Sequence, residues 1–422
     1  MKAIKLVISI FILLASVYLC QQIISLSVLN QIVKNDSAEL NHIKYGLFSI
    51  NNWKRQISTI VQEEIQDLDL SKSNRREIKK MVEAQLETLI DGIYKKIQNS
   101  NKKTFSGLFK QSLMDSFIDI KEVKVGIPEY ADALILEMSK SKTEENLKNV
   151  AIKRIEDYLN RTFDNQDLTL TDRIITKIGS KDIDEARQVL YKTNVDNRAR
   201  IELYTHIMIA LSVILFALPG LSRQTLRPSQ YIPLVISLCA LLLVGVTTPM
   251  IDMEAKITKM SFALMGHPVL FENQILYFQS KSILDVFSIM INHRDLQMKF
   301  VGLLLVSFSV IFPLLKLLTS VFYYYNVKGL RKNGLIQFFV LKSGKWSMAD
   351  VMVVAIFMAY IGFNGIITSQ MGSLNTTDPD LVFIATNGTA LQPGYYLFLT
   401  YTVLGLFLSS ILTSKPKAYA DD

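Results

Sequence analysis

Long apolar runs alternate with polar segments along this chain, and six of the runs are long enough to cross a membrane. They cover residues 4–29, 203–221, 231–249, 300–324, 347–369 and 395–412. An α-helix rises ~1.5 Å per residue, so roughly 20 apolar residues span a hydrocarbon core of ~30 Å. The pattern predicts a mainly α-helical, polytopic membrane protein with six transmembrane helices.

Residues 30–200 follow a different pattern, in which charged and apolar positions are mixed. Apolar residues at positions 82, 86, 89, 93 and 97 step by three or four, with Lys and Glu between them. Such a stripe is typical of an amphipathic helix with one buried face. We therefore expect a helical domain of roughly 170 residues between the first two spans. It would serve as a binding or spacing module.

Two loops after the third span have the alternating pattern of β-strands. Met260, Phe262 and Leu264 alternate with polar or small residues, and His267 and Pro268 follow at an expected turn. Residues 381–385 are apolar and flanked by Asn and Gly. A small β-sheet is expected from these loops. A short amphipathic helix is expected at residues 282–292.

These elements divide the chain into five parts. Residues 1–29 form a signal anchor or first transmembrane helix, although a cleaved signal peptide is the alternative. Residues 30–200 are the helical domain, and 201–222 are the second span. Residues 231–413 hold the last four spans, and 414–422 form a tail.

Basic residues in the short loops set the expected orientation, because Lys and Arg concentrate on the cytoplasmic side. The loop at 371–394 has none, whereas the opposite loops and the tail carry Arg223, Arg227, Lys328, Arg331, Lys332, Lys342, Lys345, Lys415 and Lys417. Both termini are then cytoplasmic. The 30–200 domain and the strand-bearing loops then lie outside.

Composition excludes several classes of function. The chain has 422 residues, of which 50% are hydrophobic and 20% charged, and its net charge of +8 follows no basic stripe with interleaved aromatics. Nucleic-acid binding is therefore not expected. Cys20 and Cys239 both lie in apolar runs, and no Cys or His spacing fits a metal site. No phosphate-binding loop or hydrolase motif occurs, so we expect no enzyme activity, cofactor or metal.

Two charges fall inside predicted spans. Lys316 lies late in the fourth span and Asp350 early in the fifth, so antiparallel helices would bring both toward one membrane face. Charged residues within a membrane usually mark a functional site. One hypothesis is a switchable pair, in which protonation of Asp350 releases Lys316. In the alternative, Lys316 reaches to the cytoplasmic face and Asp350 sits at a solvated helix start.

Further polar residues extend these hypotheses. Ser347, Thr319 and Asn364 are candidates for a polar network around the charged pair, or for ordinary hydrogen bonds between helices. A second set surrounds the outer end of the third span and could line an outer mouth, or could simply be solvated loop. It comprises Thr247, Thr248, Asp252, Lys281 and Ser282.

The last four spans resemble the membrane domain of the paraquat-inducible protein A family. The resemblance rests on Lys-Trp-Ser-Met-Ala-Asp-Val at 345–351, Pro313-x-x-Lys316, Lys-Ser-Ile-Leu-Asp at 281–285 and Thr-Pro-Met at 248–250. It implies a four-helix membrane unit with extracellular strands, somewhat like a tetraspanin. It also implies a bacterial inner-membrane protein that works with lipid and with periplasmic partners containing mammalian-cell-entry domains.

This chain departs from the family pattern in several ways. It has one membrane unit instead of two, lacks cysteine zinc ribbons, and has Tyr-Ile-Gly-Phe-Asn-Gly at 360–365 where many members carry a lysine. The resemblance implies a component that passes phospholipid or a similar amphiphile to or from a periplasmic tunnel, with proton coupling as an added hypothesis. A membrane sensor or scaffold whose 30–200 domain binds a ligand or envelope partner is the alternative.

Overall fold

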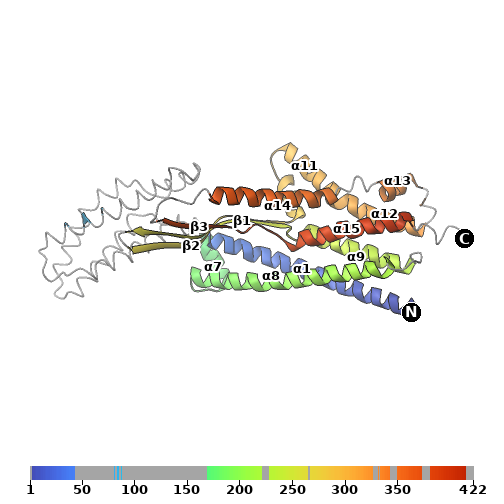
Figure 1. Cartoon of the computed structure of the whole chain (residues 1–422), viewed down its shortest axis with the longest axis horizontal. Helices are drawn as coiled ribbons and strands as arrows, with labels where there is room; N and C mark the ends of the chain where they lie inside the picture. The colour runs from blue at the N-terminus through green and yellow to red at the C-terminus, as the bar shows by residue number, and fades with distance from the viewer. Residues whose placement is uncertain are drawn as a thin grey trace.

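The computed structural model describes residues 2–42, 169–220, 228–264, 267–326, 333–342, 349–372 and 381–414, with a few isolated positions besides. Most of the helical domain expected at 30–200 lies outside the described residues. The described part of the protein is mainly helical and carries a small antiparallel sheet. The sheet projects from the end of the helical bundle that lies opposite the N-terminal end of α1 (Figure 1).

Two long helices run side by side through the molecule (Figure 1). They are α1 (Lys2–Leu40) and α8 (Ile183–Gly220), with 39 and 38 residues, and short α7 (Thr169–Ile178) precedes α8. At ~1.5 Å per residue each is about 58 Å long, nearly twice the ~30 Å hydrocarbon thickness. Both helices therefore continue, unbroken, past the boundaries expected at residues 30 and 200.

The ends of these helices are tied together. Leu40, Ile174, Ala186 and Leu190 form a small buried cluster. Arg187 donates from Nε and Nη2 to the carbonyl oxygen of Leu40, at 3.2 and 2.7 Å, and so caps carbonyls at the end of α1. We call the paired outer ends of α1 and α8, with α7, the stalk.

The remaining helices follow in chain order. They are α9 (Pro228–Thr247), α10 (Ile283–Ile291), α11 (Leu296–Val306), α12 (Phe312–Tyr325), α13 (Gly334–Gln337), α14 (Ala349–Gly372) and α15 (Pro393–Ser414). A π-helical turn, η2 (Ser307–Ile311), joins α11 to α12, and a second, η4 (Phe338–Lys342), follows α13. The wider turn of η2 comes just before Pro313, which lacks the N–H needed to continue a regular ladder.

Five helical segments in the described residues are long and apolar enough to cross a membrane. They are Val7–Leu40, Ile183–Leu218, Gln230–Thr247, Leu296–Tyr325 and Ala349–Ile366. Each overlaps one of the first five predicted spans, although Val7–Leu40 and Ile183–Leu218 extend well beyond theirs. Helix α15 has 22 residues and coincides with the predicted sixth span, but it is not among these five.

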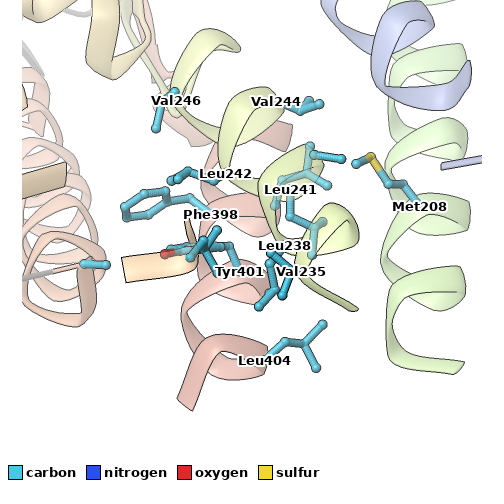
Figure 2. Close-up of a cluster of buried hydrophobic side chains, with 14 of the residues drawn as sticks. Met208, Val235, Leu238, Leu241, Leu242, Val244, Val246, Phe398, Tyr401 and Leu404 are labelled. Carbon is cyan, nitrogen blue, oxygen red and sulfur yellow. The ribbon is translucent and has the colours of Figure 1, made fainter. Parts of the chain in front are cut away.

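Helix α9 is the centre of the bundle. In α9, 67% of the apolar segment long enough to cross a membrane is buried inside the protein. In α14 the buried share of the corresponding segment is 11%. Figure 2 shows apolar side chains of α9 facing Phe398, Tyr401 and Leu404 of α15. At Gly245 an added Cβ would lie 3.0 Å from the backbone nitrogen of Phe398, so the missing side chain allows the two helices to approach closely.

The sheet has the strand order β2-β1-β3, and β4 also pairs with β1. Its strands are β1 (Ile251–Leu264), β2 (His267–Lys281), β3 (Leu381–Asn387) and β4 (Ala390–Leu391). The predicted strands in both loops are confirmed, as is the short helix, here α10. The predicted turn at His267 and Pro268 was wrong. Both residues lie in β2 and pair with Leu264 and Ala263, because the pairing of the two strands extends from Ile251 and Lys281 as far as Leu264 and His267.

Candidate functional site

Where the bundle meets the sheet, three backbone hydrogen bonds join segments that are distant in the sequence. Met250 N donates to Lys281 O at 3.0 Å, Gln392 N to Met250 O at 2.9 Å, and Gly394 N to Pro249 O at 3.0 Å. A Cβ at Gly394 would lie 2.4 Å from the carbonyl oxygen of Thr248, so only glycine fits there. These bonds fix the end of α9, the end of β2 and the start of α15 against one another.

A buried ion pair lies at this junction. Lys34 of α1 donates from Nζ to Asp252 Oδ2 of β1 at 2.5 Å and to Gln392 Oε1 at 3.1 Å. The side chains of Lys34 and Asp252 are only 11% and 8% exposed. Low exposure strengthens the attraction between the charges, and it also makes either charge costly to leave alone. The pair ties α1 to the first residues of the sheet.

Gln31, one helical turn before Lys34, adds a second connection. Its Nε2 donates to the carbonyl oxygen of Ser280 at 3.0 Å and to Asp285 Oδ2 at 3.1 Å. Asp285 also accepts from the backbone N–H of Ser282, while Asp285 N donates to Ser282 Oγ. Ser282 and Asp285 thus form a capping box that starts α10.

Several buried polar atoms at the junction lack a hydrogen-bond partner. Three buried oxygen atoms have no hydrogen-bond partner within the described part of the chain: Asn30 Oδ1, Asp252 Oδ1 and Ser280 Oγ. Asp252 and Ser280 are directly opposite each other in the β1–β2 register, so their side chains share one face of the hairpin. Asn30 and Ser280 line a small pocket together with Gln31, Lys34 and Gln392. We call these residues, with Asp252, the junction cluster.

Lys316 and Asp350 are in a different place, near the opposite end of the bundle. Lys316 is partly buried and lines a pocket with Val340, Tyr401 and Ser409, from η4 and α15. Asp350 is exposed in the first turn of α14. The two interact electrostatically, yet the structure, which describes both residues, records no direct ion pair between them.

The other members of the expected polar network are dispersed. Ser347 lies outside the described residues. Thr319 donates back to its own helix, to Leu315 O at 2.6 Å. Asn364 accepts at Oδ1 from Asn387 Nδ2 of β3, at 2.6 Å. Fourteen residues of helix separate it from Asp350, which amounts to about 21 Å. Asn364 therefore joins α14 to the sheet, away from Asp350.

Comparison with known families identifies part of this architecture. The model of the family described as paraquat-inducible protein A matches residues 274–375. Residues 274–375 form a paraquat-inducible protein A family domain. No curated protein and no solved structure matches the chain. With its membrane-length helices, the chain is a multi-pass membrane protein that carries this domain.

The boundary of the paraquat-inducible protein A domain divides the candidate residues. Lys316, Thr319, Asp350 and Asn364 fall inside it, as do Lys281 and Ser282. The ion pair of Lys34 with Asp252 lies wholly outside the matched residues, while Gln31 of α1 reaches Ser280 and Asp285 within them. The junction cluster therefore connects the domain to helix α1, which precedes it by more than 200 residues in the chain.

The residues predicted to line an outer mouth have separate roles. Thr248 lines the junction pocket, and Asp252 forms the ion pair. Ser282 caps α10, whereas Thr247 donates to Leu243 O of its own helix. Lys281 is partly buried at the end of β2, where its carbonyl accepts from Met250. Within the described residues, no cluster of His, Cys, Asp and Glu could hold a metal ion.

Sequence reasoning did not find Lys34, Gln31, Asn30 or Gln392. The signal available for the first three was their position just beyond the apolar run that ends at residue 29. That position is typical of any span that leaves a membrane, so it does not single out a partner. For Gln392 the only feature in the sequence was its position directly before Pro393.

Proposed function

We propose that this protein is an inner-membrane component of an envelope lipid-trafficking system. It passes phospholipid or a similar amphiphile to or from a periplasmic partner with mammalian-cell-entry domains. The observation that carries the proposal is the paraquat-inducible protein A domain at residues 274–375, set in a chain with five candidate membrane helices. In this proposal α15 is a sixth span, and the last four spans form a tetraspanin-like unit.

The proposed orientation places both termini in the cytoplasm and the sheet with the stalk in the periplasm. The sheet and the outer end of α1 project from the bundle in a common direction (Figure 1), which supports placing them on one side of the membrane. The basic residues of the opposite loops favour the periplasm for that side. A periplasmic sheet and stalk would offer a docking surface to a soluble tunnel protein. Cysteine labelling with a membrane-impermeant reagent at exposed Glu272, against exposed Leu335 of α13, tests this orientation.

Lys316 and Asp350 are the proposed site of proton coupling. Their electrostatic interaction without a direct ion pair means that protonation of Asp350 would change the field at Lys316. Thr319 and Ser347 stand near them in the sequence as further candidates. Asn364 would act elsewhere, by holding α14 to β3 through Asn387.

The experiment is gene deletion followed by complementation. Loss of the protein is expected to raise detergent sensitivity and surface-exposed phospholipid, and the wild-type chain should restore both. Lys316→Ala and Asp350→Ala should fail to restore them at equal expression. Lys299→Ala and Asp295→Ala change exposed charges of the same domain and should restore them fully. Absence of any envelope defect in the deletion would refute the function, and full rescue by both site variants would refute the site.

A sensor or scaffold is the second candidate, and the stalk favours it. Continuous helices α1 and α8 link the segment 43–168 to the bundle, which would let a bound ligand or partner act on the membrane helices. Replacing residues 43–168 with a short Gly-Ser linker separates the candidates. A sensor or scaffold would lose envelope rescue while phospholipid binding by the membrane helices persists.

A further inference from the structure

We propose that the junction cluster is a binding site for a zwitterionic phospholipid headgroup, one that carries a phosphate and a primary ammonium. The ammonium enters the pocket that α1 forms with Arg198 of α8, Ser280 of β2 and Gln392, and the phosphate lies at the pocket rim. This inference rests on the proposed function and adds to it the class of headgroup and the residues that recognise it.

The height of the pocket supports a headgroup. Three helices that line or adjoin it leave their apolar stretches at this level: α1 after residue 29, α8 before Ile201, and α9 at Thr247. Membrane-spanning segments end where hydrocarbon gives way to the headgroup layer. Ile201, Pro249 and Pro393 give the pocket an apolar margin toward the bundle. A lipid in the outer leaflet would therefore present its headgroup at the height of the junction cluster.

The unpartnered atoms identify the group that enters. Asn30 Oδ1 and Asp252 Oδ1 can only accept, the Ser280 hydroxyl can accept or donate, and the three residues are only 4%, 6% and 2% exposed. An unbonded buried acceptor is rare in native proteins, so a donor is expected there. A primary ammonium carries three N–H donors, enough for the two unpartnered atoms of pocket-lining residues, Asn30 Oδ1 and Ser280 Oγ. The pocket is partly open and has room for a group about the size of one water molecule.

The protein already places one primary ammonium in the same surroundings. Lys34 Nζ donates hydrogen bonds to Asp252 Oδ2 and Gln392 Oε1, so the junction already holds one ammonium group between two oxygen acceptors. The second carboxylate oxygen of Asp252 remains for another donor. A ligand ammonium in the pocket would thus lie beside Lys34, whose own ammonium is paired with Asp252.

The charges at the rim explain why the headgroup is zwitterionic. Arg198 of α8 lines the pocket, and its bond to Glu202 uses only Nε, which leaves four other guanidinium N–H donors. Guanidinium groups bind phosphate oxygens well. The pairs Lys34–Asp252 and Arg198–Glu202 each cancel in charge, so the site has no surplus cation to attract a purely anionic headgroup.

The test is competitive lipid binding to the full chain in detergent, read by native mass spectrometry. An equimolar mixture of short-chain phosphatidylethanolamine, phosphatidylcholine and phosphatidylglycerol is added. The choline lipid keeps the phosphate and net charge but has no N–H donor, and the glycerol lipid lacks the ammonium. We expect the ethanolamine lipid to bind about tenfold more tightly than either, the scale of a hydrogen bond to a charged group.

Variants assign the selectivity to the cluster. Ser280→Ala and Asn30→Leu should each reduce the ethanolamine preference severalfold, and together abolish it. Both remove a buried polar atom that has no partner in the structure, so folding should be retained. Arg198→Gln should weaken all three lipids alike. Ser309→Ala is the matched control, since Ser309 Oγ is also buried and unpartnered but lies in η2, away from the junction.

Each other outcome overturns the inference. Equal binding of the three lipids means that the pocket holds only water, and unchanged preference in the double variant places the headgroup elsewhere. Displacement of the lipid signal by millimolar free ethanolamine identifies a soluble amine as the ligand. The proposed function fails separately: a deletion strain without an envelope defect would refute lipid trafficking even if the purified protein selects the ethanolamine lipid.

Discussion

Replacing Lys34 with methionine removes the cation of the buried ion pair while keeping a long, unbranched side chain. Asp252, whose side chain is 8% exposed, would then lose the ammonium that lies 2.5 Å from it. Its Oδ1 is already without a hydrogen-bond partner, so no neighbouring donor is in place to compensate. Breaking a buried pair by removing one partner costs about 3–5 kcal/mol. We expect Lys34→Met to lower the free energy of unfolding by that amount.

The assay is reversible unfolding of the purified chain in mixed micelles, arranged as a double-mutant cycle. Asp252→Asn alone should also destabilise, because it leaves Lys34 buried with only amide and carbonyl oxygens. The double variant leaves no unpaired buried charge, so it should recover most of the free energy of unfolding lost in the single variants. The coupling energy between the two side chains is then about 2 kcal/mol or more. A coupling near zero would show that the two side chains do not meet in solution.

A second ion pair on the same helix provides the matched control. Lys177 of α7 lies 2.7 Å from Asp36 of α1, but its side chain is 54% exposed and that of Asp36 is 20% exposed. Solvent screens such a pair, so Lys177→Met should cost less than about 1 kcal/mol. If Lys34→Met cost no more than Lys177→Met, burial at the junction would have no energetic consequence and the reasoning would be refuted.

Three further substitutions probe the architecture with the same unfolding assay. Gly394→Ala should cost about 2–3 kcal/mol or prevent folding, because its Cβ would lie 2.4 Å from the fixed carbonyl oxygen of Thr248. Tyr231→Phe should cost about 1 kcal/mol, because it removes the buried hydrogen bond to Ser320 Oγ at 2.8 Å. Ser282→Ala should cost about 1 kcal/mol through loss of the capping box at the start of α10.

Each of these has a partner substitution that should be nearly silent. Gly405→Ala meets nothing within 4 Å, so it controls for Gly394→Ala on the same helix. Tyr396→Phe removes a hydroxyl from a residue that is 46% exposed, and Ser288→Ala removes one from the exposed side of α10. A control that cost as much as its test variant would contradict the assigned contact.

The helices and most strands could be predicted because the signals are local. Each membrane-length helix coincides with a continuous apolar run, and the membrane requires such a run whatever the neighbours are. The hairpin was only partly predicted, although Ile251, Met253, Ala255 and Ile257 alternate with polar residues through the first half of β1. The charged residues in that segment favoured the interpretation as a solvated loop, because alternation over a few residues is weaker evidence for a strand than a long apolar run is for a membrane helix.

For the candidate site, the sequence predicts only that its residues lie at a similar level, close to the ends of the apolar runs. Thr248 lies at the end of one apolar run, Asp252 just after it, and Lys34 just after another run, so a membrane of fixed thickness brings all three to a similar level. Their meeting depends on which face α1 turns toward α9, and 218 residues separate Lys34 from Asp252. No periodicity within either segment encodes that rotation, because the apolar faces of α1 also suit lipid. The polar residues themselves select it, since any other rotation would leave Asp252 buried without its cation.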